Sequence, residues 1–199
     1  MIAVLTGDIV NSRKGETKNW LTALKNVLSH YGAEPKDWEI YRGDSFQLSV
    51  KPENAFIAAI HIKAEIKKTT SLDVRLGIGL GEETHKADKI TESNGSAYQL
   101  SGEGFDLLKK QTLAFKLQNK ELTQELNLML ALLLLTADRW SNTVAEVIKT
   151  VIEHPEKNQQ EIAQILNKSQ SNVSEALKRG GFEEIMNMNK FYQAKISVL

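Results

Sequence analysis

A Gly-Asp pair between two short strand-like runs is the feature that most constrains this chain. Gly43 and Asp44 follow the run Trp38–Tyr41 and precede Ser45–Val50, in which apolar and polar side chains alternate with the period of a half-buried strand. A Gly-Asp pair at this place predicts a tight hairpin turn, because both residues accept turn conformations of the backbone. We therefore expect Asp44 at the hairpin tip, with an exposed carboxylate.

The apolar run near the N-terminus predicts the strand that pairs with this hairpin. Residues 2–5 are continuously apolar, as in a central strand buried on both faces, and the strand ends at Asp8. The elements are expected in the order of this first strand, a helix over 16–31, the hairpin, a helix opened by Pro52 and a strand over 74–80. This is the order of a ferredoxin-like domain, in which the first strand lies antiparallel beside the third. The topology thus predicts that Asp8 meets Asp44.

The second half of the chain is predicted to be mainly helical. Residues 81–95 lack a clear period and predict a long loop. A helix is expected over 119–137, and its second half is apolar all round, which predicts burial between domains or in a dimer. We place an α+β, ferredoxin-like and nucleotide cyclase-like domain at 1–118, the connecting helix at 119–137 and an all-α helix-turn-helix domain at 138–199.

Composition excludes several classes of protein. The 25 basic residues balance the 25 acidic ones, which argues against broad non-specific binding to nucleic acid or to an anionic membrane, although a local basic patch is compatible with it. The chain has no cysteine, so disulfides, thiolate metal sites and cysteine nucleophiles are ruled out. We see no signal peptide, and the longest apolar run, residues 128–135, is too short to span a bilayer. We expect a cytoplasmic protein without a membrane partner.

The two aspartates predict a divalent-metal site. Two carboxylates at neighbouring strand ends can hold Mg²⁺ or Mn²⁺ and leave positions for the phosphates of a nucleotide. Nearby residues that could donate to phosphate are Asn11, Ser12, Arg13 and Arg42. The alternative is that Asp44 only forms the turn, that Asp8 only caps a helix near Ser12, and that both arginines are ordinary surface residues.

Three segments carry a resemblance to known families. They are residues 4–12 (VLTGDIVNS), 42–46 (RGDSF) and 74–81 (VRLGIGLG). Residues 1–108 resemble the SatD family and, more remotely, the catalytic domains of class III nucleotidyl cyclases and diguanylate cyclases. The likeness to SatD covers most of the chain, and the likeness to the cyclases covers about half. The cyclase resemblance implies that Asp8 and Asp44 hold the metal and that Gly43 and Asn94 lie at a bound nucleotide.

One departure from the cyclase pattern bears on activity. Cyclases follow the glycine-rich strand with an Asn and an Arg, one helical turn apart, that stabilise the transition state. The corresponding stretch here, residues 93–102 (SNGSAYQLSG), has Asn94 but no arginine. Without that cation, charge that develops on the transferring phosphate is poorly compensated. We expect no useful cyclisation of ATP or GTP, whereas binding of a metal and a nucleotide remains expected.

A second motif lies between Asn158 and Arg179. Asn158 and Glu161 form a capping-box pattern, Asn167 suits a turn that needs a left-handed residue, and Ser169 is placed to cap the next helix. This spacing resembles the helix-turn-helix of bacterial regulators. The residues expected to face DNA are Gln170, Ser171, Ser174, Lys178 and Arg179. The alternative is a small helical protein-interaction domain.

Three functions follow from these motifs. The first is a DNA-binding transcriptional regulator whose N-terminal domain senses a nucleotide, and such a regulator is expected to be a homodimer. The second is a metal-dependent enzyme acting on nucleoside triphosphates, with the C-terminal domain as a DNA-binding address. The third is a protein-interaction module without a ligand. The missing arginine favours the first function over the second, and the aspartate pair favours either over the third.

Overall fold

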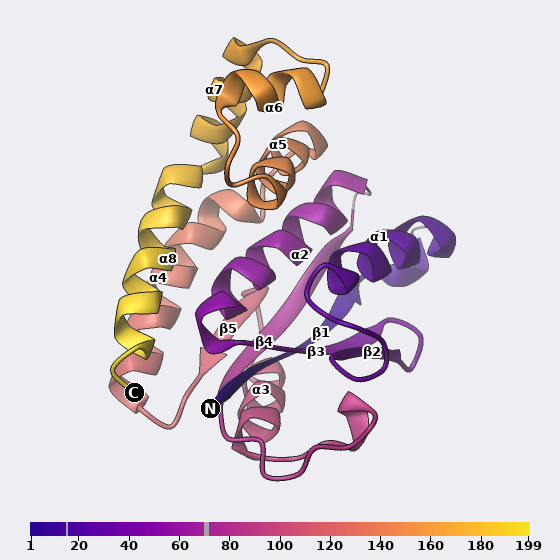
Figure 1. Cartoon of the computed structure of the whole chain (residues 1–199), viewed down its shortest axis with the longest axis vertical. Helices are drawn as coiled ribbons and strands as arrows, with labels where there is room; N and C mark the ends of the chain where they lie inside the picture. Colours follow the sequence, from indigo (N-terminus) through magenta and orange to yellow (C-terminus); the bar gives the residue numbers. More distant parts are fainter. Residues whose placement is uncertain (15, 70–71) are drawn as a thin grey trace.

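A computed structural model describes residues 1–14, 16–69 and 72–199. It combines one mixed sheet with helices, which confirms the α+β class (Figure 1). The strands are β1 (Ile2–Val10), β2 (Trp38–Tyr41), β3 (Ser45–Val50), β4 (Asp73–Gly81) and β5 (Leu113–Lys116). The helices are α1 (Thr17–Ser29), α2 (Ala55–Thr69), α3 (Ser96–Asp106), α4 (Lys120–Ala137), α5 (Asn142–Glu153), α6 (Gln159–Ile165), α7 (Gln170–Gly180) and α8 (Phe182–Ile196). Short 3-10 turns are η1 (Ser12–Lys14), η2 (Pro52–Asn54) and η3 (Ile90–Glu92).

The strand β1 is at the centre of the sheet, whose order is β2-β3-β1-β4-β5. It runs antiparallel to both neighbours, and the register opposes Asp8 to Ser45 of β3 and to Arg75 of β4. The predicted antiparallel pairing of the first strand with the third is therefore confirmed. The added strand β5 pairs parallel with β4.

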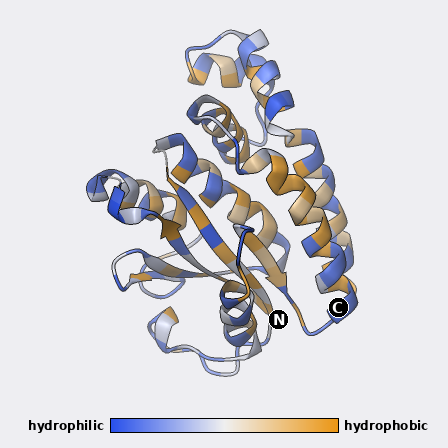
Figure 2. Cartoon of the chain, turned by 180° about the vertical axis from the view of Figure 1, so that it is seen from behind, coloured by the Kyte–Doolittle hydropathy of each residue, from blue (hydrophilic) through white to orange (hydrophobic). Residues whose placement is uncertain are grey.

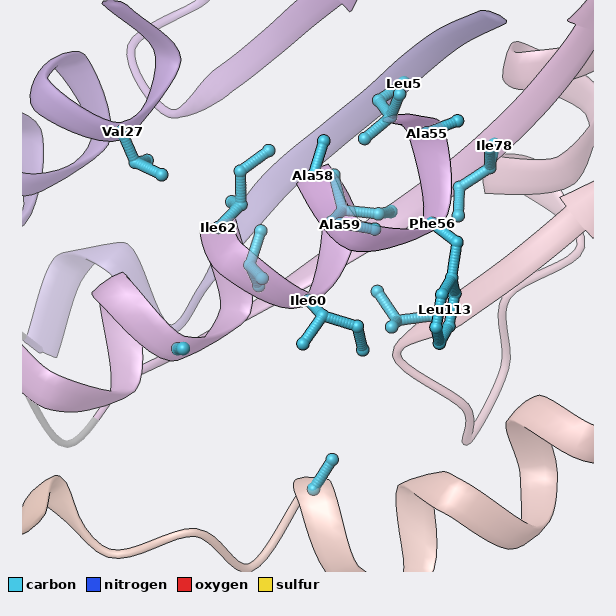
Figure 3. Close-up of a cluster of buried hydrophobic side chains, with 14 of the residues drawn as sticks. Leu5, Val27, Ala55, Phe56, Ala58, Ala59, Ile60, Ile62, Ile78 and Leu113 are labelled. Atoms are coloured by element: carbon cyan, nitrogen blue, oxygen red, sulfur yellow. The ribbon is translucent and has the colours of Figure 1, made fainter. Parts of the chain in front are cut away.

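Large apolar side chains cover one face of the sheet. The helix α2 lies between this face, α1 and α5, and 11 of its 15 residues are buried. Figure 3 shows Ala55 and Ile62 of α2 in this cluster together with Leu5 of β1 and Ile78 of β4. Burial on every side explains why α2 lacks the single apolar stripe of a surface helix.

Glycines on β4 shape the opposite face, where α3 packs. A Cβ atom at Gly77 or Gly79 would lie 2.3 Å or 2.2 Å from the backbone of α3, a distance no side chain tolerates. The alternating glycines thus let α3 rest directly on the strand. Arg75 lies two residues before Gly77 and on the same face of β4. It is therefore the first side chain on this face beyond the glycines that contact α3.

The C-terminal helices share the core of the N-terminal half. The helix α5 packs on α2, α7 packs on α5, and α8 lies along α4 (Figure 1). Tyr192 of α8 stacks on Phe115 of β5 with ring centroids 5.2 Å apart, and its hydroxyl donates to the carbonyl of Pro52 at 2.6 Å. The hydrophobic cluster is continuous across residue 118. The division at 1–118, 119–137 and 138–199 stays a prediction.

The helix α4 has one buried and one exposed side. Leu122, Leu126, Leu130 and Leu134 are buried, whereas Leu128, Leu132 and Leu135 are exposed. The apolar second half of this helix is thus only half accounted for by packing within the chain. No helix in the described part of the chain is long and apolar enough to cross a membrane.

Candidate functional site

A pocket of about 630 Å³ opens where β1 ends. Its lining comes from the end of β1 and the turn after it, from the hairpin tip, from β4, and from the loop between α3 and β5. The residues are Asp8, Ile9, Val10, Asn11, Ser12, Arg13, Lys14, Asp44, Arg75, Lys109, Lys110, Gln111 and Thr112. The N–H of Ile9 donates to the carbonyl of Asp44 at 3.2 Å, so the two aspartates are brought to one pocket, as the topology predicted.

Arg75 holds Asp8 in a two-point ion pair. Its Nε and Nη2 donate to the two carboxylate oxygens of Asp8 at 3.0 Å and 2.5 Å, and the guanidinium lies 5.3 Å from the ring centre of Phe105. The hydrogen bond to Asp8 raises the pKa of the Arg75 guanidinium, against a smaller lowering by burial. The pair is partly open to solvent, so a ligand can reach both groups.

Asp44 is oriented by the turn that follows β1. The hydroxyl of Ser12 donates to Asp44 Oδ2 at 2.5 Å. Asn11 takes a left-handed conformation with φ 59°, which asparagine tolerates better than most residues, and the chain then turns into η1. This turn places Arg13 and Lys14 at the rim of the pocket.

Positive charge dominates the pocket lining. Five cationic side chains surround the two carboxylates: Arg13, Lys14, Arg75, Lys109 and Lys110. This excess of three positive charges favours an anionic ligand. Phosphate groups suit such a lining, because arginine and lysine are their usual partners in proteins.

The oxygen atoms of Asp8, Asp44 and Ser12 are of the type that a hard divalent cation binds, but most of them are already hydrogen bonded to protein groups. Carboxylate and hydroxyl oxygens are ligands that Mg²⁺ and Mn²⁺ accept. Both oxygens of Asp8, however, are engaged by Arg75, and one oxygen of Asp44 by Ser12. Within the described ranges there is no group of three or more His, Cys, Asp or Glu side chains that could hold a metal. A cation bound here would therefore compete with Arg75 for Asp8 and would take further ligands from phosphate or water.

The structure does not bring Asn94 to this pocket. Asn94 pairs with His85 in a small bridge, and its side-chain oxygen accepts from the N–H of Gly95 at 2.7 Å. The segment follows Gly81, which opposes Ile2 at the far end of β1 from Asp8. A nine-residue strand thus separates Asn94 from the aspartates. The cyclase resemblance implies that Asn94 and the two aspartates contact the same nucleotide, but the structure does not bring them together.

The hairpin tip also points two expected residues away from the pocket. Arg42 and Gly43 have φ angles of 52° and 92°, and both are exposed outside the lining. Arg42 and Gly43 thus lie on the exposed part of the tip, whereas Asp44 lines the pocket.

Several pocket residues have no counterpart in the sequence-based prediction. Arg75 belongs to the segment 74–81 that resembles the cyclases, but the sequence does not predict its pairing with Asp8. Nor does the sequence predict that the loop residues Lys109, Lys110 and Thr112 line the pocket. The sequence signal for them was a Lys-Lys pair immediately before a short strand, whose position depends on how β5 joins the sheet.

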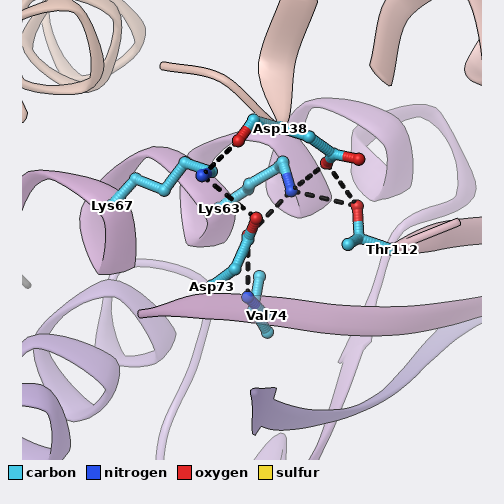
Figure 4. A network of polar contacts seen from close by, with 6 residues as sticks. All are labelled: Lys63, Lys67, Asp73, Val74, Thr112 and Asp138. Atoms are coloured by element: carbon cyan, nitrogen blue, oxygen red, sulfur yellow. Dashed lines mark hydrogen bonds and ion pairs between the residues drawn. The ribbon is translucent and has the colours of Figure 1, made fainter. Parts of the chain in front are cut away.

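An ionic network around the fully buried Lys63 adjoins the pocket at Thr112, and Figure 4 shows its residues. Lys63 Nζ of α2 contacts Asp73 Oδ1 and Asp138 Oδ1 at 2.7 Å each, and it donates to the hydroxyl of Thr112 at 3.0 Å. Lys67 adds contacts to Asp73 and to the backbone carbonyl of Asp138. Thr112 belongs both to this network and to the pocket lining, whereas Asp138 ends α4. The pocket is thereby connected to the start of the C-terminal helices.

The helices α6 and α7 have the local signals expected from the sequence. Asn158 and Glu161 form a capping box, Asn167 is left-handed with φ 50°, and Ser169 accepts from the N–H of Asn172 at the start of α7. Gly181 ends α7 in a left-handed conformation with φ 67°.

The exposed side of α7 carries all five residues expected to contact DNA. Gln170, Ser171, Ser174, Lys178 and Arg179 are exposed, whereas Val173, Ala176 and Gly180 are buried. By helical spacing, Ser171, Ser174 and Lys178 share the centre of this exposed side. Glu175 lies there too and pairs with Arg179 at 3.7 Å; the sequence-based prediction left it out.

Comparison with known proteins gives one finding. No curated protein matches the chain. The family model described as the SatD family matches residues 1–194. The chain therefore belongs to the SatD family.

Proposed function

We propose that this protein is a DNA-binding transcriptional regulator whose N-terminal part senses a phosphate-bearing nucleotide together with Mg²⁺ or Mn²⁺. The observation that carries the proposal is the pocket in which Asp8 and Asp44 lie among five cationic side chains. A site with both kinds of charge suits a metal–nucleotide complex, because the carboxylates hold the cation and the basic residues hold the phosphates.

The strand order supports a ferredoxin-like, cyclase-like assignment for this part of the chain. The order β2-β3-β1-β4, with β1 antiparallel to both neighbours, is the one expected for a split βαβ domain. In this arrangement the end of β1 and the β2–β3 turn lie together. Bound metal would neutralise phosphate charge, and the residues of the chain would orient the nucleotide.

The helices α5, α6 and α7 support the DNA-binding part. The helix α7 is short, capped by Ser169 and exposed on the side that bears Gln170, Ser171 and Ser174. Such side chains suit contacts to base edges. Lys178 and Arg179 at the end of α7 suit contacts to phosphates, and Glu175 restricts which bases that surface accepts, because a carboxylate accepts a hydrogen bond only from a donor such as the cytosine amino group.

The Lys63 network provides a route between the two parts. Ligand binding that moves Thr112 acts on Lys63 and Asp138, to which Thr112 is hydrogen bonded. Asp138 ends α4 and precedes α5, which packs against α7. We propose that nucleotide binding changes DNA affinity through this contact.

The test of this function is a genomic pull-down with purified protein, followed by mobility shifts with and without ATP or GTP and Mg²⁺. We expect an enriched sequence and a shift whose midpoint depends on the nucleotide. An absence of any enriched sequence, together with no shift at low salt, would favour the protein-interaction function instead.

A metal-dependent enzyme acting on nucleoside triphosphates is the second candidate. The observation that favours it is Arg75, which supplies a cation beside Asp8 although the stretch after β4 lacks an arginine. We expect no useful cyclisation, because Asn94 is remote and one arginine already bound to Asp8 compensates developing charge poorly. Robust production of a cyclic nucleotide by the purified protein with Mn²⁺ would favour the enzyme.

A further inference from the structure

A stripe of exposed leucines runs along α4. Leu128, Leu132 and Leu135 are 65%, 63% and 62% exposed. Their spacing of four and three residues puts them on one side of the helix. Among the described residues they make up three of the eight large hydrophobic side chains that are exposed, so this apolar surface is concentrated rather than scattered. Figure 2 shows the hydrophobic colour of α4 beside the more hydrophilic α8.

A groove continues this stripe toward α7 and α8. It has a volume of about 480 Å³, and its apolar lining includes Met129, Leu132, Leu133 and Met188. The opposite side of α4 already fills the core of the chain through Leu126 and Leu130. The exposed leucines therefore add little to packing within one chain, whereas the groove residues Met129, Leu133 and Met188 pack against the core and also line the groove.

The charges at the two ends of the stripe have opposite sign. Glu121 and Glu125 lie at the N-terminal end and are exposed, whereas Arg139 lies exposed in the turn after the C-terminal end. Glu125 already pairs with Lys195 of α8 at 3.3 Å. Parallel pairing of two such stripes would oppose like charges, and antiparallel pairing opposes unlike charges.

We propose that α4 pairs antiparallel with α4 of a second copy of this chain. Centred on Leu130, this pairing places Leu128 against the partner's Leu132 and Glu121 against the partner's Arg139, because each pair lies equally far on either side of the centre. The contact is two-fold symmetric and closes on itself, as a dimer requires. The proposal rests on the exposed leucines of α4 and on the charges at its two ends, and it does not depend on the nucleotide or DNA function.

The first experiment measures the dimer by sedimentation or light scattering of the full chain across a range of concentrations. Leu132→Glu introduces a charge two residues from the centre of the contact and is expected to raise the dimer dissociation constant about tenfold or more. Ile165→Glu is the matched control, because Ile165 is also exposed, at 48%, but lies on α6. A wild-type chain that stays monomeric at about 100 μM, where a specific contact would associate, overturns the proposal, as does a dimer that tolerates Leu132→Glu.

Charge reversal tests the antiparallel arrangement. Glu121→Arg opposes two arginines across the contact, and Arg139→Glu opposes two glutamates, so each variant alone is expected to dimerise more weakly than the wild type. A mixture of the two variants is expected to form a heterodimer, because each changed residue then meets its opposite charge. No preference for the heterodimer in the mixture would overturn the antiparallel pairing, even if the leucine stripe is a dimer contact.

Discussion

Two clusters of aspartates and basic residues adjoin each other in this protein, and they differ in how far their cation is buried. In the inner cluster Lys63 is fully buried and contacts two carboxylates and a hydroxyl. In the outer cluster Arg75 remains 39% exposed, pairs with one carboxylate, that of Asp8, and lies over the Phe105 ring. The same residue types therefore serve two purposes. The inner cluster joins α2, β4 and the end of α4, and the outer one offers charges that a ligand can take over.

The largest expected effect breaks the inner cluster. Among the described residues, Lys63→Met leaves the Asp138 carboxylate without a cation and Asp73 with Lys67 alone, which is expected to lower the free energy of unfolding by about 3–5 kcal/mol. Arg75→Met in the outer cluster is the matched comparison and should cost about 1 kcal/mol or less, because Arg75 itself is 39% exposed and its ion pair is screened by solvent. Urea unfolding followed by circular dichroism measures both. Equal losses would mean that burial does not distinguish the two clusters.

The comparison extends to a second buried group, His61. Its Nδ1 lies 2.9 Å from the hydroxyl of Tyr31 and its Nε2 lies 3.3 Å from Glu153 Oε1, with Lys149 and His30 also nearby. Burial lowers the pKa of His61 to about 4, and Glu153 offsets only part of that effect.

The direction of the pH effect follows from this shift. Below pH 6.5 the unfolded chain binds a proton at His61 that the folded chain refuses until about pH 4, so stability is full above pH 6.5 and falls as the pH drops toward 4. Between pH 7 and pH 5 the loss should be about 2 kcal/mol. His61→Gln should flatten this part of the profile in urea unfolding at several pH values. A profile that is identical in the variant would show that His61 does not set it.

In the outer cluster, changing Arg75 should move two affinities in opposite directions. Arg75→Gln releases Asp8 and removes a positive charge, so Mn²⁺ should bind more tightly, whereas a nucleoside triphosphate without metal should bind several-fold more weakly. Electron paramagnetic resonance of Mn²⁺ and calorimetry of the triphosphate measure the two changes. Both affinities changing in the same direction would contradict the competition between metal and Arg75.

Asp44→Asn tests the metal more simply. The substitution should abolish Mn²⁺ binding and leave the melting temperature nearly unchanged or raised, because two neighbouring carboxylates repel each other in the absence of metal. Asp88→Asn is the control, since Asp88 is exposed and outside the pocket lining. Equal binding of Mn²⁺ by the wild type and by Asp44→Asn would place the site elsewhere.

The smallest effect concerns the two cations at the end of α7. Lys178→Ala together with Arg179→Ala should weaken binding to all DNA sequences and reduce the salt dependence by about two ions for each chain. Ser171→Ala or Gln170→Ala should instead change which sequence is preferred. Lys86→Ala with Lys89→Ala removes the same charge far from α7 and should leave DNA binding unchanged. An unchanged salt dependence in the α7 variant would remove those two residues from the DNA contact.

Local signals in the sequence predicted much of the fold. The remaining pocket residues depend on how strands far apart in the sequence pair with each other. Turn chemistry at Gly43 and Asp44 and the alternation in β3 gave the hairpin, and the order of elements placed Asp8 beside it. The pairing of Asp8 with Arg75 depends on the register of β1 against β4, which no local pattern determines. Lys109 and Thr112 reach the pocket only because β5 joins β4.

Asn94 is a predicted site residue that the structure places apart from the aspartates. The resemblance to cyclases associated it with the aspartates, but the segment after β4 stays at the far end of that strand and closes a bridge with His85. The order of motifs along the chain thus predicts that Asn94 follows β4. It does not predict where the long loop that carries Asn94 lies relative to the aspartates.

Calorimetric titration of the full chain with ATP and GTP, each with and without Mg²⁺, tests the central claim most directly. We expect saturable binding of at least one nucleotide that is tighter with Mg²⁺, weakened several-fold by Lys109→Ala with Lys110→Ala, and unaffected by Lys86→Ala with Lys89→Ala. No heat of binding for either nucleotide under any of these conditions, or equal weakening by the two double variants, would contradict the assignment of the pocket at Asp8 and Asp44 as a nucleotide site.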